Sequence, residues 1–148
     1  MELTDLVSPD RLIVGFQANG KPQLLAELAR QAAMGTGRPQ KEIADALQAR
    51  ESLGSTGVGS GIAIPHAQVS GLARFFGLFV RLNRPIDYDA IDGRRVDLVF
   101  LLLIPQNTKE HLHALAAISH RLRDPKIASN LRRAKSGLEL YEALIGPL

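Results

Sequence analysis

Apolar residues recur at helical spacing in two stretches of the first fifty residues. Pro22 opens the first stretch at a position where its missing N–H is harmless, and Gly35 and Gly37 close it. Pro39 opens the second stretch. The residues of the two apolar stripes are Leu24, Leu25, Leu28, Ala29 and Ala32 in the first and Ile43, Ala46 and Leu47 in the second. This pattern predicts two consecutive amphipathic helices.

Four other stretches have the composition of β-strands. Residues 12–14 and 62–65 are short apolar runs, and residues 73–82 are rich in residues that favour strands. Residues 96–104 are almost entirely apolar after Asp97, which is typical of a central strand buried on both faces. Strands and helices therefore mix along the chain, and the mixture predicts an α/β fold in which helices cover a central sheet.

Helix start signals recur in the last third of the chain. They are Asn107 with Glu110, Asp124 with Pro125, and Ser136 with Glu139. The first pair has the spacing of a capping box, in which each residue bonds the other's backbone N–H. The other two pairs place a side chain that accepts hydrogen bonds at the start of a helix. Three further helices are therefore predicted, beginning at these signals.

Length and composition fit one globular domain spanning residues 1–148. The chain has 148 residues, of which 45% are hydrophobic and 22% charged, and it contains no linker or repeat. No apolar run approaches the roughly 18–20 residues that a membrane span needs, and the acidic N-terminus does not resemble a signal peptide. The chain has no cysteine. Disulfides, thiolate catalysis and Cys-ligated zinc are thereby excluded, and a cytoplasmic location is expected.

The net charge of +3 comes largely from a basic stretch near the C-terminus, residues 121–135. Basic patches can bind nucleic acid, but no aromatic residue interleaves with these charges to stack on bases. We therefore expect a solvated helix face and no nucleic-acid partner. A docking surface for an acidic protein is the alternative.

The most unusual stretch of the sequence is GSTGVGSGIAIPHA, residues 54–67. Clustered glycines suggest a nucleotide loop, but such loops run from a strand through glycines into a helix. Here a helical stretch precedes the glycines, a strand-like run follows them, and no Lys-Ser or Lys-Thr closes the loop. The order of elements excludes the nucleotide-loop interpretation. The remaining candidate for chemistry in this stretch is His66, next to its end.

Of the four histidines, His66 has the most informative setting, next to a strand and downstream of the glycines. His111 lies in the first turn of a predicted helix and continues its core-facing stripe, so it can point toward the sheet. For His113 and His120 a structural or exposed role is expected, since neither shows a positioned partner. His111 and His113 are two residues apart and do not face one another, so no helical metal pair is present. No metal site is predicted.

The residues around His66 suit the acceptance of a phosphoryl group. Arg50 ends the preceding helix, and the loop can fold its guanidinium back toward the imidazole, where it matches phosphate oxygens. The residues predicted to cradle the phosphoryl group are Ser55, Thr56, Gly57, Gly59 and Gly61. Hydrolysis needs an oriented base that activates water, and none is evident. A histidine nucleophile flanked by an arginine and His111 therefore indicates a phosphoryl carrier rather than a hydrolase.

At these residues the sequence resembles a known family. RESLGSTGVGSGIAIPHA, residues 50–67, resembles the active-site signature of the EIIA proteins of the bacterial phosphotransferase system, fructose/mannitol class. Residues 86–115 and 131–144 resemble the later blocks of the same family, so the likeness covers nearly the whole chain. It is greatest to the nitrogen-regulatory EIIA-Ntr members. The resemblance implies a mixed central sheet flanked by helices on both faces.

The resemblance also implies a mechanism and partners. His66 would accept the phosphoryl group on Nε2 from a phosphohistidine of an HPr-like carrier, called NPr in the nitrogen branch. Arg50 and His111 match the family's arginine and second active-site histidine. No metal or organic cofactor is expected. Targets in the family include potassium-transport regulators and sensor kinases, and a homodimer is plausible on general grounds.

The chain departs from the family pattern in one place and leaves alternatives open. Many relatives have Gly-Lys where this sequence has Ala67 and Gln68. The missing lysine removes a cation near the site, so partner choice or the stability of the phosphorylated form is expected to differ.

A sugar-specific EIIA component of a fructose- or mannitol-type permease is one alternative function. A non-catalytic binding module of the same fold is another.

Overall fold

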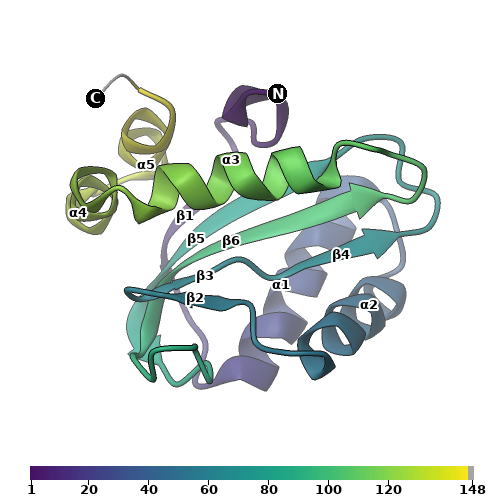
Figure 1. The fold of residues 1–148 in the computed structure, drawn as a ribbon, viewed down its shortest axis with the longest axis horizontal. Coiled ribbons are helices and arrows are strands. Elements are labelled where there is room, and N and C mark those ends of the chain that lie inside the picture. Colours follow the sequence, from purple (N-terminus) through teal and green to yellow (C-terminus); the bar gives the residue numbers. More distant parts are fainter. Residues whose placement is uncertain (147–148) are drawn as a thin grey trace.

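A mixed six-stranded sheet forms the centre of the protein, in a computed structural model that describes residues 1–146 (Figure 1). The elements are the short 3-10 helix η1 (Leu3–Asp5), the strands β1 (Leu12–Phe16), β2 (Gly57–Gly59), β3 (Ile62–Ala63), β4 (His66–Val69), β5 (Phe76–Ile86) and β6 (Val96–Pro105), and the helices α1 (Lys21–Thr36), α2 (Gln40–Ser52), α3 (His111–Arg123), α4 (Pro125–Arg133) and α5 (Gly137–Ile145). The strand order is β1-β5-β6-β3-β2, and β4 pairs with β6 beyond the end of β3. The predicted α/β class and mixed sheet are confirmed.

The central strand β6 organises the sheet. It pairs antiparallel with β5 on one side and parallel with both β3 and β4 on the other. Side chains alternate between the two faces of a strand, so β6 supplies both cores. The side chains of Val99, Leu101 and Leu103 enter one core, and those of Phe100 and Leu102 enter the other. The prediction of a central strand buried on both faces is confirmed.

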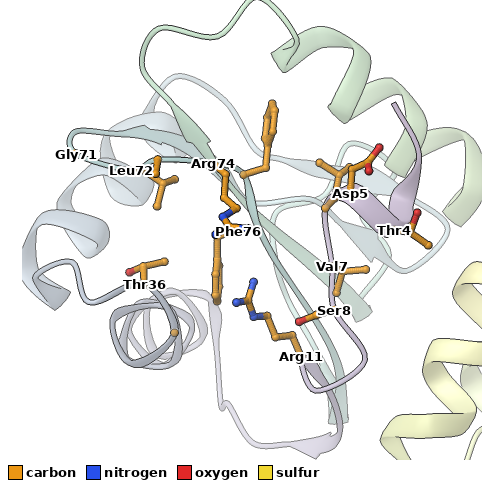
Figure 2. Close-up of a pocket in the computed structure, with 14 residues that line it drawn as sticks. Thr4, Asp5, Val7, Ser8, Arg11, Thr36, Gly71, Leu72, Arg74 and Phe76 are labelled. Atoms are coloured by element: carbon orange, nitrogen blue, oxygen red, sulfur yellow. The ribbon is translucent and has the colours of Figure 1, made fainter.

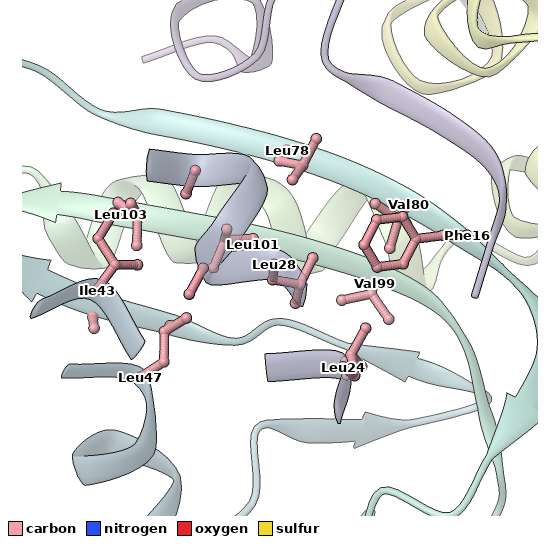
Figure 3. Packing of buried hydrophobic residues seen from close by; sticks show 14 of the residues in the cluster. Phe16, Leu24, Leu28, Ile43, Leu47, Leu78, Val80, Val99, Leu101 and Leu103 are labelled. Carbon is pink, nitrogen blue, oxygen red and sulfur yellow. The ribbon is translucent and has the colours of Figure 1, made fainter. Parts of the chain in front are cut away.

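Helices cover both faces of this sheet, as predicted. The α1 and α2 helices pack on one face, where Leu24, Leu28, Ile43 and Leu47 meet Leu101 and its neighbours (Figure 3). The α3, α4 and α5 helices pack on the opposite face; α3 lies in front of the sheet and α1 and α2 lie behind it in Figure 1. Within residues 1–146, no helix combines the length and the apolar character needed to cross a membrane.

Most of the predicted helix boundaries agree with the structure. The N–H of Gly37, which adopts a left-handed φ of 73°, caps the end of α1. The side chain of Asp124 accepts a hydrogen bond from the N–H of Lys126 at the start of α4, and that of Ser136 accepts one from the N–H of Glu139 at the start of α5. These signals could be recognised in the sequence because each cap forms its bond within four residues of itself.

The predicted capping box of Asn107 and Glu110 is wrong. The α3 helix begins at His111, and its N-cap residue, Glu110, makes no side-chain capping bond. The N–H of Glu110 instead donates to the Thr108 hydroxyl, 3.1 Å away. The Glu110 carboxylate pairs with the ring of His113 at 3.0 Å. A competing turn and this ion pair replace the box.

The short strands around the glycine stretch also differ from the prediction. Residues 62–65 were expected to form one strand, but β3 stops at Ala63 and β4 begins at His66. Pro65 lies in the break because it has no N–H to donate to a neighbouring strand, although its carbonyl still accepts from the N–H of Leu102. Part of the glycine stretch is itself a strand, β2, paired antiparallel with β3. His66 is therefore the first residue of a strand rather than the end of one.

The basic stretch near the C-terminus is only partly a solvated face. The Arg121 side chain donates to the carbonyl oxygens of Leu144, at 2.6 Å, and Gly146. The Arg132 guanidinium binds both oxygens of the Asp97 carboxylate, at 2.8 and 2.9 Å. The exposed basic residues of the stretch are Arg123, Lys126, Arg132, Arg133 and Lys135. Two of the arginines thus tie α3 and α4 to other elements.

Candidate active site

The position of His66 follows from the way β4 pairs with the sheet. His66 pairs with Leu102 of β6 and is half-buried. The next residues that share one face of β4, Ala67 and Val69, belong to the core against α1 and α2. Alternation along the strand therefore directs His66 toward the face that α3 covers.

Hydrogen bonds fix the tautomer of His66. Its Nδ1 lies 2.7 Å from the carbonyl oxygen of Ile64. A carbonyl only accepts, so Nδ1 carries the proton and donates it. The other ring nitrogen, Nε2, accepts from Nε of Arg50 at 3.3 Å, and the same guanidinium donates from Nη1 to the carbonyl of Gly54 at 2.9 Å. The lone pair of a neutral imidazole is thus presented at Nε2.

The surroundings of His66 lower its pKa from the ordinary value of 6.5. Burial contributes most, because it disfavours the charged ring. The positive charge of Arg50 and the nearby His111 also lower the pKa. The hydrogen bond to Ile64 and the negative charge of Glu51 act in the opposite direction and raise it. The imidazole is therefore neutral, and nucleophilic, at neutral pH and somewhat below it.

We expect the pKa of His66 to lie below 6.5 in an NMR titration of the histidine ring resonances. The Arg50→Ala variant should raise this pKa toward the ordinary value, because one of the charges that disfavour the imidazolium is removed. The depressed pKa also determines how the stability of the protein depends on pH. Between the folded-state pKa and 6.5 the unfolded chain binds more protons, so this group lowers stability as the pH falls through that window. A pKa above 6.5 in the wild type would contradict the geometry.

His111 reaches the same site from α3, of which it is the first residue. It lies close enough for its charge to lower the pKa of His66. Its Nδ1 is buried and has no hydrogen-bond partner among the described residues. A buried polar nitrogen without a partner costs free energy, so this ring nitrogen would gain from a hydrogen-bonding partner.

Beside Arg50 lies a buried polar network that the sequence analysis did not predict. The Glu51 side chain is only 2% exposed, and its carboxylate accepts from Nζ of Lys21 at 2.8 Å and from the N–H of Thr56 at 3.2 Å. The hydroxyls of Thr56 and Tyr88 donate to the same carboxylate, the latter at 2.9 Å. The network therefore ties the end of α2 to α1, to the glycine stretch and to the segment after β5.

The charges in this network are consistent with an ionised carboxylate. Burial alone would raise the pKa of Glu51, but the bonds from Lys21, Thr56 and Tyr88 outweigh it and hold the pKa below the ordinary value. Burial first, and then the charge of Glu51, raise the pKa of Tyr88, which stays a hydroxyl donor. The sequence carried one signal: Glu51 follows Leu47 at i+4 on the buried stripe of α2, where an apolar residue is expected.

The two hydroxyl residues predicted to cradle a phosphoryl group are already engaged. The Ser55 hydroxyl donates to the carbonyl of Tyr88 at 3.1 Å and accepts from the N–H of Gly57 at 3.1 Å. The Thr56 hydroxyl is bound to Glu51. The hydroxyls of Ser55 and Thr56 and the N–H of Gly57 are therefore used in contacts within the protein, and these contacts do not support a direct cradling role.

Gly59 and Gly61 lie at the β2–β3 turn and serve packing. A side chain on Gly59 would come within 3.3 Å of the Asp92 carboxylate, and one on Gly61 within 2.6 Å of the Arg132 guanidinium. Both glycines have positive φ, 99° and 80°, which few other residues adopt. The structure does not bring these two glycines to His66, and a neighbouring carboxylate is unfavourable for a phosphate.

The remaining histidines lie apart from this site. His113 is exposed and pairs with Glu110, which corrects the expectation that it has no partner. His120 is exposed in the last turn of α3. Within residues 1–146, no three side chains of the metal-binding types gather as a metal ion would require.

Comparison with known proteins identifies the family. Residues 5–146 match the family described as "Phosphoenolpyruvate-dependent sugar phosphotransferase system, EIIA 2". The chain belongs to this EIIA family of the phosphotransferase system. Membership gives it, in general terms, phosphoryl-carrier activity and a regulatory EIIA role.

Individual relatives point to the nitrogen-regulatory branch. The nitrogen regulatory protein of Bradyrhizobium diazoefficiens is 46% identical over 99% of this chain and 97% of its own length. That of Escherichia coli K12 is 43% identical over 97% of this chain and 90% of its own length. The crystal structure of the nitrogen regulatory protein IIA-Ntr of Neisseria meningitidis superposes with a TM-score of 0.90 at 30% identity, covering 96% of this chain and 98% of the other.

Proposed function

We propose that the chain is a regulatory phosphocarrier of the nitrogen branch, which accepts a phosphoryl group on Nε2 of His66 from a phosphohistidine of an HPr-like carrier of the NPr type. The observation that carries this proposal is the fixed tautomer of His66, held by Ile64 at Nδ1 and by Arg50 at Nε2. The names of the relatives support the nitrogen branch over a sugar-specific component. The exchange would take place in the cytoplasm without a metal ion or organic cofactor.

The transfer step is an in-line displacement. The hydrogen bond from Nε of Arg50 to His66 Nε2 is released, and the lone pair of Nε2 forms the new bond to phosphorus. The bond from phosphorus to the carrier's ring nitrogen breaks, and its electron pair returns to that ring. The Nδ1 proton of His66 stays on its bond to Ile64 throughout. Phosphoryl transfer depends mostly on positioning and charge stabilisation. The Arg50 guanidinium, next to Nε2, and the unpartnered ring nitrogen of His111 supply both to the phosphoryl oxygens.

A carrier must also protect its phosphohistidine from water. Activation of water needs a free general base near phosphorus. The carboxylate that lies closest in sequence to Arg50 is Glu51, and its oxygens are occupied by Lys21, Thr56 and Tyr88. The Glu51 carboxylate is therefore engaged in structural contacts and is not free to act as a base beside His66.

Exposed apolar side chains beside the site support docking of a carrier protein. Leu53 follows the end of α2 and is 85% exposed, and Leu112 follows His111 and is 68% exposed. Large apolar side chains in the open are typical of contact surfaces. A carrier that covers both leucines would exclude water from the space between them and His66.

Single-turnover transfer from the phosphorylated carrier tests the proposal. We expect Arg50→Ala and His111→Ala to slow transfer by roughly 10²-fold each, because each removes a group that stabilises the transferring charge. The rate is followed by intact mass against time. The matched control is His113→Ala, which removes an exposed histidine two residues from His111 and should transfer at the wild-type rate. Unchanged rates in both site variants would contradict the roles given to them.

A further inference from the structure

A hollow lies beside β5, at the opposite edge of the sheet from the glycine stretch (Figure 2). The strand β1 pairs with β5 only from Phe79 onward, so Phe76, at the start of β5, pairs with β6 on one side and has no strand on the other. The N-terminal segment, the end of α1 and the loop of residues 71–75 surround this open edge. They line a half-open cavity of about 520 Å³, within the range of roughly 300–1,000 Å³ that small-molecule sites occupy.

Two cations without partners line this cavity. Within residues 1–146, neither Arg11 nor Arg74 forms a side-chain hydrogen bond or an ion pair, and Figure 2 shows both guanidinium groups pointing into the space beside Phe76. The Arg11 guanidinium stacks over the Phe76 ring, 4.3 Å from its centre, which fixes its position. The one carboxylate of the lining, that of Asp5, accepts from the N–H of Glu2 at 2.8 Å and points away from both arginines. The cavity therefore favours an anion.

The rest of the lining indicates the class of anion. Leu72 and Phe76 line the cavity from the α1–α2 side of the sheet, and Phe75 supplies an apolar ring from the α3 side. The cavity is far larger than an inorganic phosphate needs. The guanidinium group of arginine binds phosphate oxygens through a planar fork and also stacks on flat rings. The lining therefore suits a molecule that has both a phosphate group and a flat ring.

We propose that this cavity binds an organic phosphate of mononucleotide size, whose phosphate group contacts Arg11 and Arg74 and whose flat ring lies against Phe75. The site is separate from the acceptor histidine. Gly77 of β5 and His66 of β4 pair with opposite sides of Leu102, so two strand spacings, about 10 Å, lie between them. The proposal therefore does not depend on phosphorylation of His66.

Titration of the ¹⁵N-labelled protein with AMP tests this inference. We expect saturable shifts, at millimolar AMP, of the amide signals of Arg11, Gly35 and Phe76. The Arg11→Gln and Arg74→Gln variants should each bind roughly tenfold more weakly or worse, since each loses a charged donor to phosphate. Arg74 is exposed, so its variant keeps the test valid if loss of the Arg11 stacking harms the fold. Arg95→Gln removes the same charge from an exposed position outside the cavity and should bind AMP as the wild type does.

Three further comparisons decide the outcome. The His66→Ala variant should bind AMP unchanged, which separates this site from the proposed function. Adenosine and inorganic phosphate should each bind more weakly than AMP. Equal binding of adenosine would overturn recognition of the phosphate, and equal binding of inorganic phosphate would overturn recognition of the ring. Absence of shifts around the cavity at millimolar AMP would overturn the site altogether.

Discussion

Replacement of Glu51 by alanine is expected to destabilise the protein by about 3–5 kcal/mol, because it leaves the buried ends of Lys21 and Tyr88 without their shared acceptor. For a chain of this size such a loss lowers the melting temperature by roughly 6–20 °C. Chemical denaturation followed by circular dichroism measures the free energy of unfolding directly. The expected effect is large because the carboxylate is nearly inaccessible and four groups donate to it.

The Glu51 prediction has a matched control and a pH signature. Glu42→Ala removes an exposed carboxylate of the same helix, paired with Arg38 at 3.5 Å, and should cost less than about 1 kcal/mol. The pKa of Glu51 is depressed, so its contribution to stability is present above 4.5 and is lost as the pH falls through the depressed value. The Glu51→Ala variant should therefore lose less stability on acidification than the wild type. Equal free energies of unfolding for the Glu51 and Glu42 variants would contradict the structural role of the network.

Replacement of His66 by alanine is expected to abolish phosphorylation completely. The wild type, incubated with phosphoenolpyruvate, enzyme I and the HPr-like carrier of the nitrogen branch, should gain one acid-labile phosphoryl group by intact mass. No other ring nitrogen combines a fixed tautomer with an arginine donor, within residues 1–146, so no second site should substitute. The expected result is no mass change in the variant.

Two controls keep this result interpretable. His120→Ala removes an exposed histidine of α3 and should be phosphorylated as the wild type is. The melting temperature of His66→Ala should stay close to that of the wild type, so loss of phosphorylation is not loss of the fold. A His66→Ala protein that still gains the phosphoryl group would contradict the assignment. A wild type that gains none, beside a carrier shown to be phosphorylated, would favour a binding module of the same fold.

Elements with strong internal patterns were predictable from the sequence. The two N-terminal helices each have an apolar stripe of their own. The β6 strand was recognisable as a buried central strand because it is apolar on both of its faces. The short strands β2, β3 and β4 were not separable, since two to four residues hold no periodicity and each strand exists only through its pairing. The capping box predicted at Asn107 failed for another reason. The backbone N–H of Glu110 bonds the nearby hydroxyl of Thr108 instead, and this turn replaces the box.

The candidate site was predictable only in part, for a similar reason. The glycine stretch and His66 are adjacent in sequence, and Arg50 is near enough for the loop to return it. The network around Glu51 joins Lys21, Thr56 and Tyr88, and the last lies 37 positions away. Partners so distant are invisible to local patterns. A charged residue on a buried helical stripe was the one sign that such partners must exist.

The most direct test of the account is NMR of the phosphorylated, ¹⁵N-labelled protein, which shows through phosphorus–nitrogen coupling which atom carries the phosphoryl group. Nδ1 of His66 is committed to the carbonyl of Ile64, so the account predicts coupling to Nε2 of His66 alone. The Nδ1 proton should remain visible and hydrogen-bonded. Coupling to Nδ1 of His66, or to a nitrogen of His111, would contradict the central claim.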